Sequence, residues 1–341
     1  KLTRKWLIDF PIVLSAHGGF GYSGGNYVDV KHRGCVIHST VANDFAIEVN
    51  PPEWRFGSSL ENFTLLGDAS GFGLRVRNIG WNSQVRNVTC DNFKGKNLSI
   101  GYIQDTHFYN VTCLRSLNTP ENPALHFDAD ANYVYFHGCR FENANYLINT
   151  ANAWQVHFNH CHFETGYYNG ALGAVNEYRY KDAPCIKTSG RWVNFTNPTF
   201  VPIPTNVFKD EFGIAVNNVP YFIEWNSSIS NMVNPVIINP SDNYLKGGVK
   251  FLLNTAPKCR NTIVGGSLSQ LESRVPAIVA DDLVISSGCL LHFRRQDTPD
   301  FFGFAINTGG IHNCTLAKDA DTATRNNGYL QYSYVQSCFS V

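Results

Sequence analysis

The sequence lacks three features that would point to common partners or locations. It has no net charge, with 27 basic and 27 acidic residues among 341, so it offers no excess of positive charge for nucleic acid or an anionic membrane. No run of about 18 apolar residues occurs, and we therefore expect no membrane span. The chain begins at Lys1 and Met232 is its only methionine. We expect it to be a processed or trimmed part of a longer chain, with any targeting signal outside it.

What the sequence does contain is a short phrase that recurs five times. The copies occupy residues 60–65, 85–90, 108–113, 136–141 and 158–163. Each copy has an apolar residue, two polar or small residues, an apolar residue or cysteine, any residue, and a final apolar residue. The final position falls at 65, 90, 113, 141 and 163, a step of 22 to 28 residues. A period of that size indicates stacked units, and we predict that each unit is one coil of a β-solenoid.

A second phrase keeps step with the first, at residues 73–77, 97–101, 124–128 and 146–150. Each coil should therefore carry at least two short strands, and equivalent residues should stack into columns that only the whole solenoid buries. The expected columns are Phe63, Val88, Val111, Cys139 and Cys161 for the first phrase, and Leu74, Leu98, Leu125 and Leu147 for the second. An antiparallel sandwich also has short strands and turns, but it does not predict two ladders in phase.

Both phrases continue beyond residue 163, but long inserts separate them. The inserts occupy residues 164–183, 201–212, 239–247, 291–303 and 317–328. Because they all follow the first phrase, they should leave from one edge of the solenoid, where such folds build binding faces. We expect one continuous domain, in which residues 1–33 lead into the solenoid and residues 34–341 form it.

Cysteines and asparagines occupy repeated positions. Five of the ten cysteines fall on inward positions, where a free thiol behaves as a small apolar group; these are Cys90, Cys113, Cys139, Cys161 and Cys314. A reduced ladder is favoured and indicates folding in a reducing compartment, although a bridge between neighbouring coils stays open. Three Asn-X-Thr sites share one position of the phrase, at Asn62, Asn87 and Asn110. We interpret them as stacked structural amides rather than glycosylation sites.

These Asn-rich coils with inward cysteine and phenylalanine resemble the right-handed parallel β-helix of the pectate-lyase superfold, especially phage tailspike depolymerases. The resemblance covers essentially the whole chain and is carried by the repeats. It implies an all-β, single-stranded right-handed parallel β-helix that cleaves a bacterial surface polysaccharide, usually as a homotrimer. Of the polygalacturonase motifs only Asp281-Asp282 occurs, and tailspikes similarly lack a shared catalytic motif. Function must therefore be argued from site chemistry.

Two acids on consecutive coils are the first catalytic candidates. Arg140 and Glu142 should lie over His162 and Glu164, because neighbouring strands are about 5 Å apart. Like charges at that distance raise the pKa of one carboxyl group, which can keep an acid protonated beside an ionised base. Arg140 and His162 are candidates for substrate binding; alternatively, they neutralise the two acids in a surface ladder.

Outward residues of the second phrase supply further candidates. His126 is a candidate for substrate binding, and Asp128 is an alternative catalytic partner. Arg75, Arg77 and Lys187 share this outward side and could bind an acidic sugar, or could be solvated charges with buried stems.

The longest insert is rich in tyrosine and contributes Tyr167, Tyr168 and Glu177 as substrate-binding candidates. Tyrosine stacks well on pyranose rings, but these side chains could equally pack on a neighbouring subunit. If the stacked acids are not catalytic, the next acids to consider are Glu177, Asp182, Asp210 and Glu211. His157, His160 and His162 alternate between faces or lie in a turn, so we expect no metal site and no cofactor.

We expect an endo-acting depolymerase of a bacterial surface polysaccharide, such as capsule or O-antigen, and favour a glycoside hydrolase with a carboxylate pair. A polysaccharide lyase would need a cation such as Arg75 or Lys187 beside a base such as His126 or a tyrosine. A non-catalytic glycan-binding adhesin rod would need only the aromatic loops. The resemblance further implies a homotrimer in a bacteriophage tail that serves host adsorption, or else a secreted or cell-surface protein.

Overall fold

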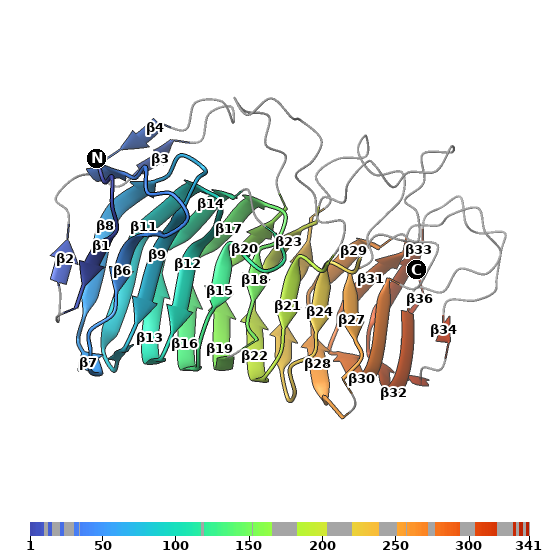
Figure 1. Ribbon diagram of the computed structural model, residues 1–341. Coiled ribbons are helices and arrows are strands. Elements are labelled where there is room, and N and C mark those ends of the chain that lie inside the picture. The colour runs from blue at the N-terminus through green and yellow to red at the C-terminus, as the bar shows by residue number, and fades with distance from the viewer. Residues whose placement is uncertain are drawn as a thin grey trace.

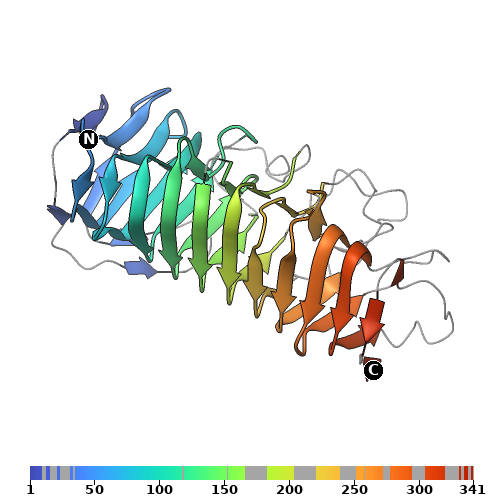
Figure 2. The ribbon, with the colours of Figure 1, turned by 90° about the horizontal axis from the view of Figure 1, so that it is seen from below.

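All the regular elements of the computed structural model are strands, in the part of the chain that it describes. The described residues are 1–9, 13–15, 21–23, 31–33, 35–116, 119–151, 153–165, 183–202, 220–238, 251–256, 258–271, 277–293, 304–318, 330–331, 334–336 and 339–340. The strands advance in chain order along a rod (Figure 1), and the view from below shows the same succession (Figure 2). The fold is the predicted right-handed parallel β-helix.

Each coil contributes strands to three faces, which we name A, B and C in the order in which the chain visits them. Face A contains the second phrase and comprises β1 (Trp6–Ile8), β6 (Phe45–Val49), β9 (Phe72–Arg77), β12 (Gly95–Gly101), β15 (Leu125–Phe127), β18 (Ile148–Asn149), β21 (Ile186–Thr188), β24 (Ile223–Trp225), β27 (Leu252–Asn254), β34 (Leu330–Gln331) and the first parts of β30 (Ile278–Ser286) and β32 (Phe304–His312).

Faces B and C carry the two halves of the first phrase. Face B comprises β2 (Val13–Ser15), β13 (Ile103–Tyr109), β16 (Ala131–His137), β19 (Ala153–Asn159), β22 (Arg191–Thr196), β25 (Asn231–Val233), β28 (Asn261–Val264), β35 (Tyr334–Gln336), the first parts of β8 (Ser59–Leu66) and β11 (Ser83–Phe93), and the last parts of β30 and β32. Face C comprises β5 (Cys35–His38), β14 (Thr112–Ser116), β17 (Arg140–Ala144), β20 (His162–Glu164), β23 (Thr199–Val201), β26 (Val236–Ile237), β29 (Ser267–Leu271), β31 (Leu290–Phe293), β33 (Thr315–Lys318), β36 (Phe339–Ser340) and the last parts of β8 and β11.

Two small pairs stand apart from these faces. β7 (Arg55–Phe56) and β10 (Ile79–Gly80) pair in parallel beside the rod. β3 (Gly21–Ser23) and β4 (Lys31–Arg33) form an antiparallel hairpin in the leading segment. That same segment already supplies β1 and β2, which pair in parallel with β6 and β8.

The register confirms the first-phrase columns. Val88 pairs with Phe63 and Cys90 with both Leu65 and Cys113, and the matching residues of later coils continue the stacks. On face B the inward phenylalanines Phe108, Phe136 and Phe158 stack with ring centroids 4.8 and 4.9 Å apart. This distance matches the spacing between strands, so each ring fills the core and covers its neighbour.

One predicted column is wrong by a residue. Leu125 pairs with Ile148 rather than with Leu147, and His126 pairs with Asn149. The backbone amides of Leu147 and Ile148 both point to the carbonyl of Cys185, at 2.8 and 3.3 Å, so the chain bulges here. Both side chains are buried, and two adjacent apolar residues left the register open in the sequence.

The asparagines form the predicted ladder at the corner between faces B and C. Asn87 Nδ2 donates to Asn62 Oδ1 at 2.9 Å, and Asn110 Nδ2 donates to Asn87 Oδ1 at 3.2 Å. All three have left-handed backbones, with φ of 62°, 51° and 51°, a conformation in which asparagine is strongly favoured among non-glycine residues. The left-handed backbone therefore explains why asparagine recurs at this corner in these three coils.

Eight described cysteines carry free thiols, of which Cys35 is exposed and the others are buried: Cys35, Cys90, Cys113, Cys139, Cys161, Cys185, Cys259 and Cys289. Burial raises the pKa of Cys90 to about 12, so its thiol is unreactive at neutral pH. Cys139 and Cys161 donate weakly from Sγ to the carbonyls of Phe108 and Phe136, at 3.4 and 3.6 Å. In the described part of the chain the ladder is thus a packing element.

The inserts leave from one edge, as predicted. They connect β20 to β21, β23 to β24, β26 to β27, β31 to β32 and β33 to β34. Each connection runs from face C to face A, and the strands on either side of the inserts are stacked neighbours. Most of the insert residues themselves lie outside the described residues.

Candidate active site

The stacked acids lie in one outward column on face C. Glu142 pairs in register with Glu164, and the column continues with Leu114 on one side and Val201 on the other. Leu114 and Val201 are buried, so the two carboxylates are enclosed between apolar residues. Glu142 is only 5% exposed, whereas Glu164 is partly exposed.

A guanidinium and an imidazole accompany the acids. Arg140 Nε lies 2.6 Å from Glu142 Oε1. His162 Nε2 lies 3.0 Å from Glu164 Oε2 and 3.6 Å from Glu142 Oε1, so the imidazole is placed between the carboxylates. Burial raises the pKa of Glu142, while Arg140 and His162 lower it by a smaller amount and Glu164 raises it further. The raised pKa favours the protonated form of Glu142, which is the form that a general acid needs.

A hollow opens beside the more buried acid. It has a volume of about 200 Å³ and is lined by Thr89, Asn110, Thr112, Leu114, Gly138, Arg140 and Glu142. Its floor is face C itself, and it extends from the acids toward earlier coils. A polymer lying along the rod could reach Glu142 through this hollow.

The same cluster has the composition of a cation site. Glu142, His162 and Glu164 each offer one ligand atom, and these atoms lie within 4.8 Å of one another. From the sequence, His162 was considered as a metal ligand only together with His157 and His160, so this set was missed. In the structure His157 is on face B and His160 is at the left-handed corner, with φ of 53°. The guanidinium of Arg140 already places one positive charge at the cluster, so a metal ion would have to compete with it.

Asp128 belongs to a different arrangement, on face A. Arg75 Nε donates to Asp128 Oδ2 at 2.8 Å, and Arg77 Nε donates to Oδ1 at 3.3 Å. Gly101 lies between Arg77 and Asp128 in the column, and a Cβ atom there would come within 2.2 Å of Asp128 Oδ1. Both carboxylate oxygens are therefore engaged, in a network that continues from Arg75 to Glu48 and Lys5.

His126 lies in the neighbouring outward column of face A. Burial lowers its pKa to about 4, and Lys96 and Arg75 add to the effect while Asp128 opposes it. Its Nδ1 atom is buried and has no hydrogen-bond partner among the described residues. At neutral pH the imidazole is uncharged.

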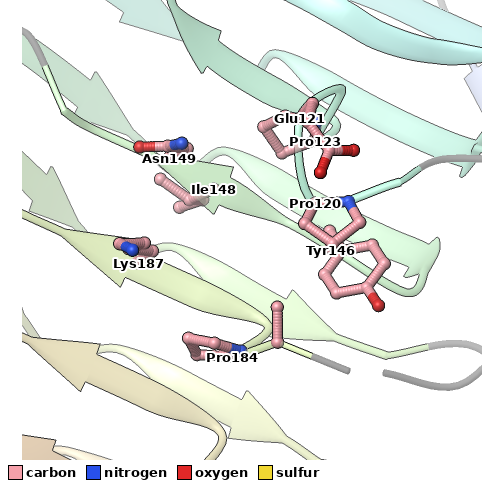
Figure 3. Close-up of a pocket in the computed structure, with 9 residues that line it drawn as sticks. Pro120, Glu121, Pro123, Tyr146, Ile148, Asn149, Pro184 and Lys187 are labelled. Carbon is pink, nitrogen blue, oxygen red and sulfur yellow. The ribbon is translucent and has the colours of Figure 1, made fainter. Parts of the chain in front are cut away.

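Lys187 lines a second pocket, of about 250 Å³, at the edge where the inserts leave. Figure 3 shows Lys187 and Asn149 on neighbouring strands, with Pro120 and Glu121 on one side and Pro184 on the other. Pro120 and Glu121 belong to the connection between β14 and β15. Pro184 lies two residues before β21, the strand that contains Lys187. Lys187 Nζ is 3.8 Å from Glu224 Oε1, a loose contact for an exposed ammonium group.

The structure thus brings Arg140, Glu142, His162 and Glu164 together on face C. It places Asp128 and His126 on face A, in a separate set of contacts. Tyr167, Tyr168 and Glu177 lie outside the described residues, as do Asp182, Asp210 and Glu211.

One polar array escaped the sequence analysis. On the outward side of face B the rings of His107, Tyr135 and His157 stack at 4.7 and 5.0 Å. Beside them, Tyr109 and His137 stack at 4.8 Å. The signal was present, because a polar ring flanks the inward phenylalanine at 107, 109, 135, 137 and 157.

No helix in the described part of the chain is long and apolar enough to cross a membrane. Comparison of the chain with protein-family models, with curated proteins and with solved structures gave no match.

Proposed function

We propose that the protein is an endo-acting glycoside hydrolase that depolymerises a bacterial surface polysaccharide, capsule or O-antigen. The observation that carries the proposal is the Glu142–Glu164 pair, with one acid buried and the other partly exposed. Glycoside hydrolysis needs two carboxyl groups in different protonation states. Burial raises the pKa of Glu142 and so favours its protonated form, which supports a role as the acid of the pair.

In this proposal Glu142 is the general acid, because burial raises its pKa. It protonates the glycosidic oxygen as the bond to the anomeric carbon breaks. Glu164, the more exposed carboxylate, attacks the anomeric carbon, and water later displaces it with Glu142 acting as base. His162 holds the Glu164 carboxylate in place through its 3.0 Å contact.

The spacing of the acids favours retention of configuration. Their ligand oxygens lie within 4.8 Å of each other. Retaining enzymes hold the two carboxyl groups about 5–5.5 Å apart, whereas inverting enzymes leave about 6.5–9.5 Å for a water molecule. We therefore expect the product to keep the anomeric configuration of the substrate.

A lyase at face A is the second candidate. It would use His126 as base and Arg75 or Lys187 to neutralise a uronate. However, an imidazole with a pKa of about 4 is a weak base at neutral pH, and Arg75 is already engaged with Asp128. The low pKa of His126 and the engagement of Arg75 with Asp128 argue against the lyase and favour the hydrolase.

The test compares Glu142→Gln and Glu164→Gln with Glu61→Gln, a control acid on face B. General acid–base catalysis contributes about 10²–10⁴ in rate, so each active-site variant should lose at least about 10²-fold in turnover with an unchanged circular dichroism spectrum. New reducing ends without ultraviolet absorbance of an unsaturated uronate indicate hydrolysis, and that absorbance indicates a lyase. No product at all indicates a glycan-binding rod.

Activity of both variants within a few-fold of the wild type would exclude the pair. The site would then lie around Glu177, Asp182, Asp210 and Glu211, or between subunits. We further propose, from the resemblance to tailspikes, that rods associate side by side as a homotrimer that serves adsorption of a phage to its host. Light scattering that shows a stable monomer would argue against the trimer.

A further inference from the structure

The cluster of Glu142, His162 and Glu164 has the ligand types and the spacing of a transition-metal site. The three residues lie on the neighbouring strands β17 and β20 (Figure 1), and the register places Glu142 directly beside Glu164. His162 Nε2 lies 3.0 Å from Glu164 Oε2 and 3.6 Å from Glu142 Oε1. Two ligand atoms that bind one ion at about 2.1 Å, about 90–110° apart, are separated by about 3.0–3.4 Å. The imidazole is therefore close to the separation from each carboxylate that a shared ion requires.

One carboxylate oxygen of the cluster lacks a hydrogen bond. Glu142 Oε1 is buried and, although Arg140 Nε is 2.6 Å away, it accepts no hydrogen bond of normal geometry from the described residues. Asp91, an enclosed acid of the same outward column, differs because Arg115 donates to both of its oxygens. A buried oxygen without a directed donor is costly unless an ion or another group binds it. The orphaned oxygen of Glu142 therefore points to a ligand.

The cluster is shielded from water but remains accessible to an ion. The side chains of Glu142, Glu164 and His162 are 7%, 19% and 23% exposed. The hollow of about 200 Å³ reaches Glu142 from the side of the earlier coils. An ion could enter through this hollow, and water there could complete the coordination sphere, since three protein ligands leave at least one position open.

We infer that Glu142, His162 and Glu164 bind one divalent transition-metal ion, of the class of Zn²⁺, and that the ion displaces the guanidinium of Arg140 from Glu142. Imidazole together with carboxylate suits such ions, whereas Ca²⁺ takes about six to eight oxygen ligands. Once the guanidinium has left, the two carboxylates balance the charge of the ion. A bound ion would occupy both carboxylates that hydrolysis uses and would inhibit the proposed hydrolase. That consequence rests on the proposed function, whereas the binding does not.

The test measures binding of Zn²⁺ to the metal-free, untagged protein by isothermal titration calorimetry, with the visible absorption of bound Co²⁺ as a second readout. One ion should bind at the cluster with a Kd of about 10 μM or less. His162→Gln and Glu164→Gln should each weaken this binding by at least about tenfold. His157→Gln removes a histidine of face B and is the matched control, which should bind as the wild type does. Ca²⁺ at the same concentration should not compete.

Arg140→Gln separates this site from adventitious binding at other histidines. The variant removes the charge that competes with the ion, so Zn²⁺ should bind at least about threefold more tightly. An ion held elsewhere in the chain would not respond. Each variant should keep the circular dichroism spectrum of the wild type. Equal binding by the wild type and His162→Gln would overturn the inference, and so would a Kd that Arg140→Gln leaves unchanged.

Measurements of activity distinguish failure of this inference from failure of the proposed function. If the metal-free protein cleaves polysaccharide, saturating Zn²⁺ should reduce turnover by at least about tenfold, and a chelator should restore it. Binding at the cluster without hydrolysis by the metal-free protein would refute the hydrolase and support the metal site. Hydrolysis without binding would support the hydrolase and refute the metal site.

Discussion

The asparagine ladder allows hydrogen bonding and backbone conformation to be measured separately at one residue. Asn87 donates to Asn62 and accepts from Asn110, at 2.9 and 3.2 Å, with φ of 51°. Asn87→Gly keeps the left-handed backbone but loses both hydrogen bonds, each worth about 0.5–1.5 kcal/mol, and adds about 0.5–1 kcal/mol of chain entropy. Asn87→Ala loses the same bonds and must also place a Cβ atom in the left-handed region, at about 1–2 kcal/mol.

We therefore expect both variants to be less stable than the wild type, with Asn87→Ala the less stable of the two by up to about 1.5 kcal/mol, the margin by which the left-handed cost for alanine exceeds the chain entropy of glycine. Urea unfolding followed by circular dichroism gives the two free energies of unfolding, provided that both variants show the same dependence on urea. If Asn87→Gly were as stable as the wild type, the ladder bonds would contribute nothing. If Asn87→Ala were the more stable variant, the backbone argument would be refuted.

Two further predictions concern face A. Asp128→Asn should lower stability by about 1.5–3 kcal/mol, because hydrogen bonds from Arg75 and Arg77 lose their charged acceptor, while turnover stays within a few-fold; a large loss of turnover at unchanged stability would make Asp128 catalytic. His126 has a pKa near 4 in the folded protein against 6.5 in the unfolded chain, so the unfolded chain binds more protons between these values and stability should fall as the pH drops from about 6.5 to 4. The loss is at most about 3 kcal/mol, and His126→Asn should remove that part of the pH dependence; equal pH dependence of wild type and variant in thermal unfolding would contradict it.

The fold was predictable because stacking repeats one local rule. Inward residues of a solenoid contact their equivalents in the next coil, so Phe63, Val88 and Cys139 could be assigned to one column from spacing alone. The rule failed where spacing was ambiguous. Leu147 and Ile148 are both apolar, and only the bulge at the carbonyl of Cys185 decides which of them pairs with Leu125.

The candidate site was predictable in register but not in electrostatics. Spacing placed Glu142 beside Glu164, but it gave no measure of burial. The column shows why Glu142 is buried, since Leu114 precedes it and Val201 follows Glu164.

The contacts of Asp128 could not be predicted from the sequence for another reason. Arg75 lies 53 positions before Asp128 in the chain and reaches it across the small side chain of Ser99. The spacing of the repeats does not indicate that a side chain will extend over two coils.

Outward columns are therefore where function has to be sought in such a rod. An inward position is constrained by the residues stacked above and below it, whereas an outward position can change without disturbing the core. The column of Leu114, Glu142, Glu164 and Val201 is informative because acids replace apolar residues at an enclosed position. Enclosing a carboxylate costs free energy even when a cation is near, and the coils on either side show that the fold accepts an apolar residue there. Asp91 is also an enclosed acid of this column, and it is paired with Arg115. Our proposal that Glu142 and Glu164 serve chemistry therefore rests on their direct pairing and on the hollow beside Glu142, rather than on enclosure alone.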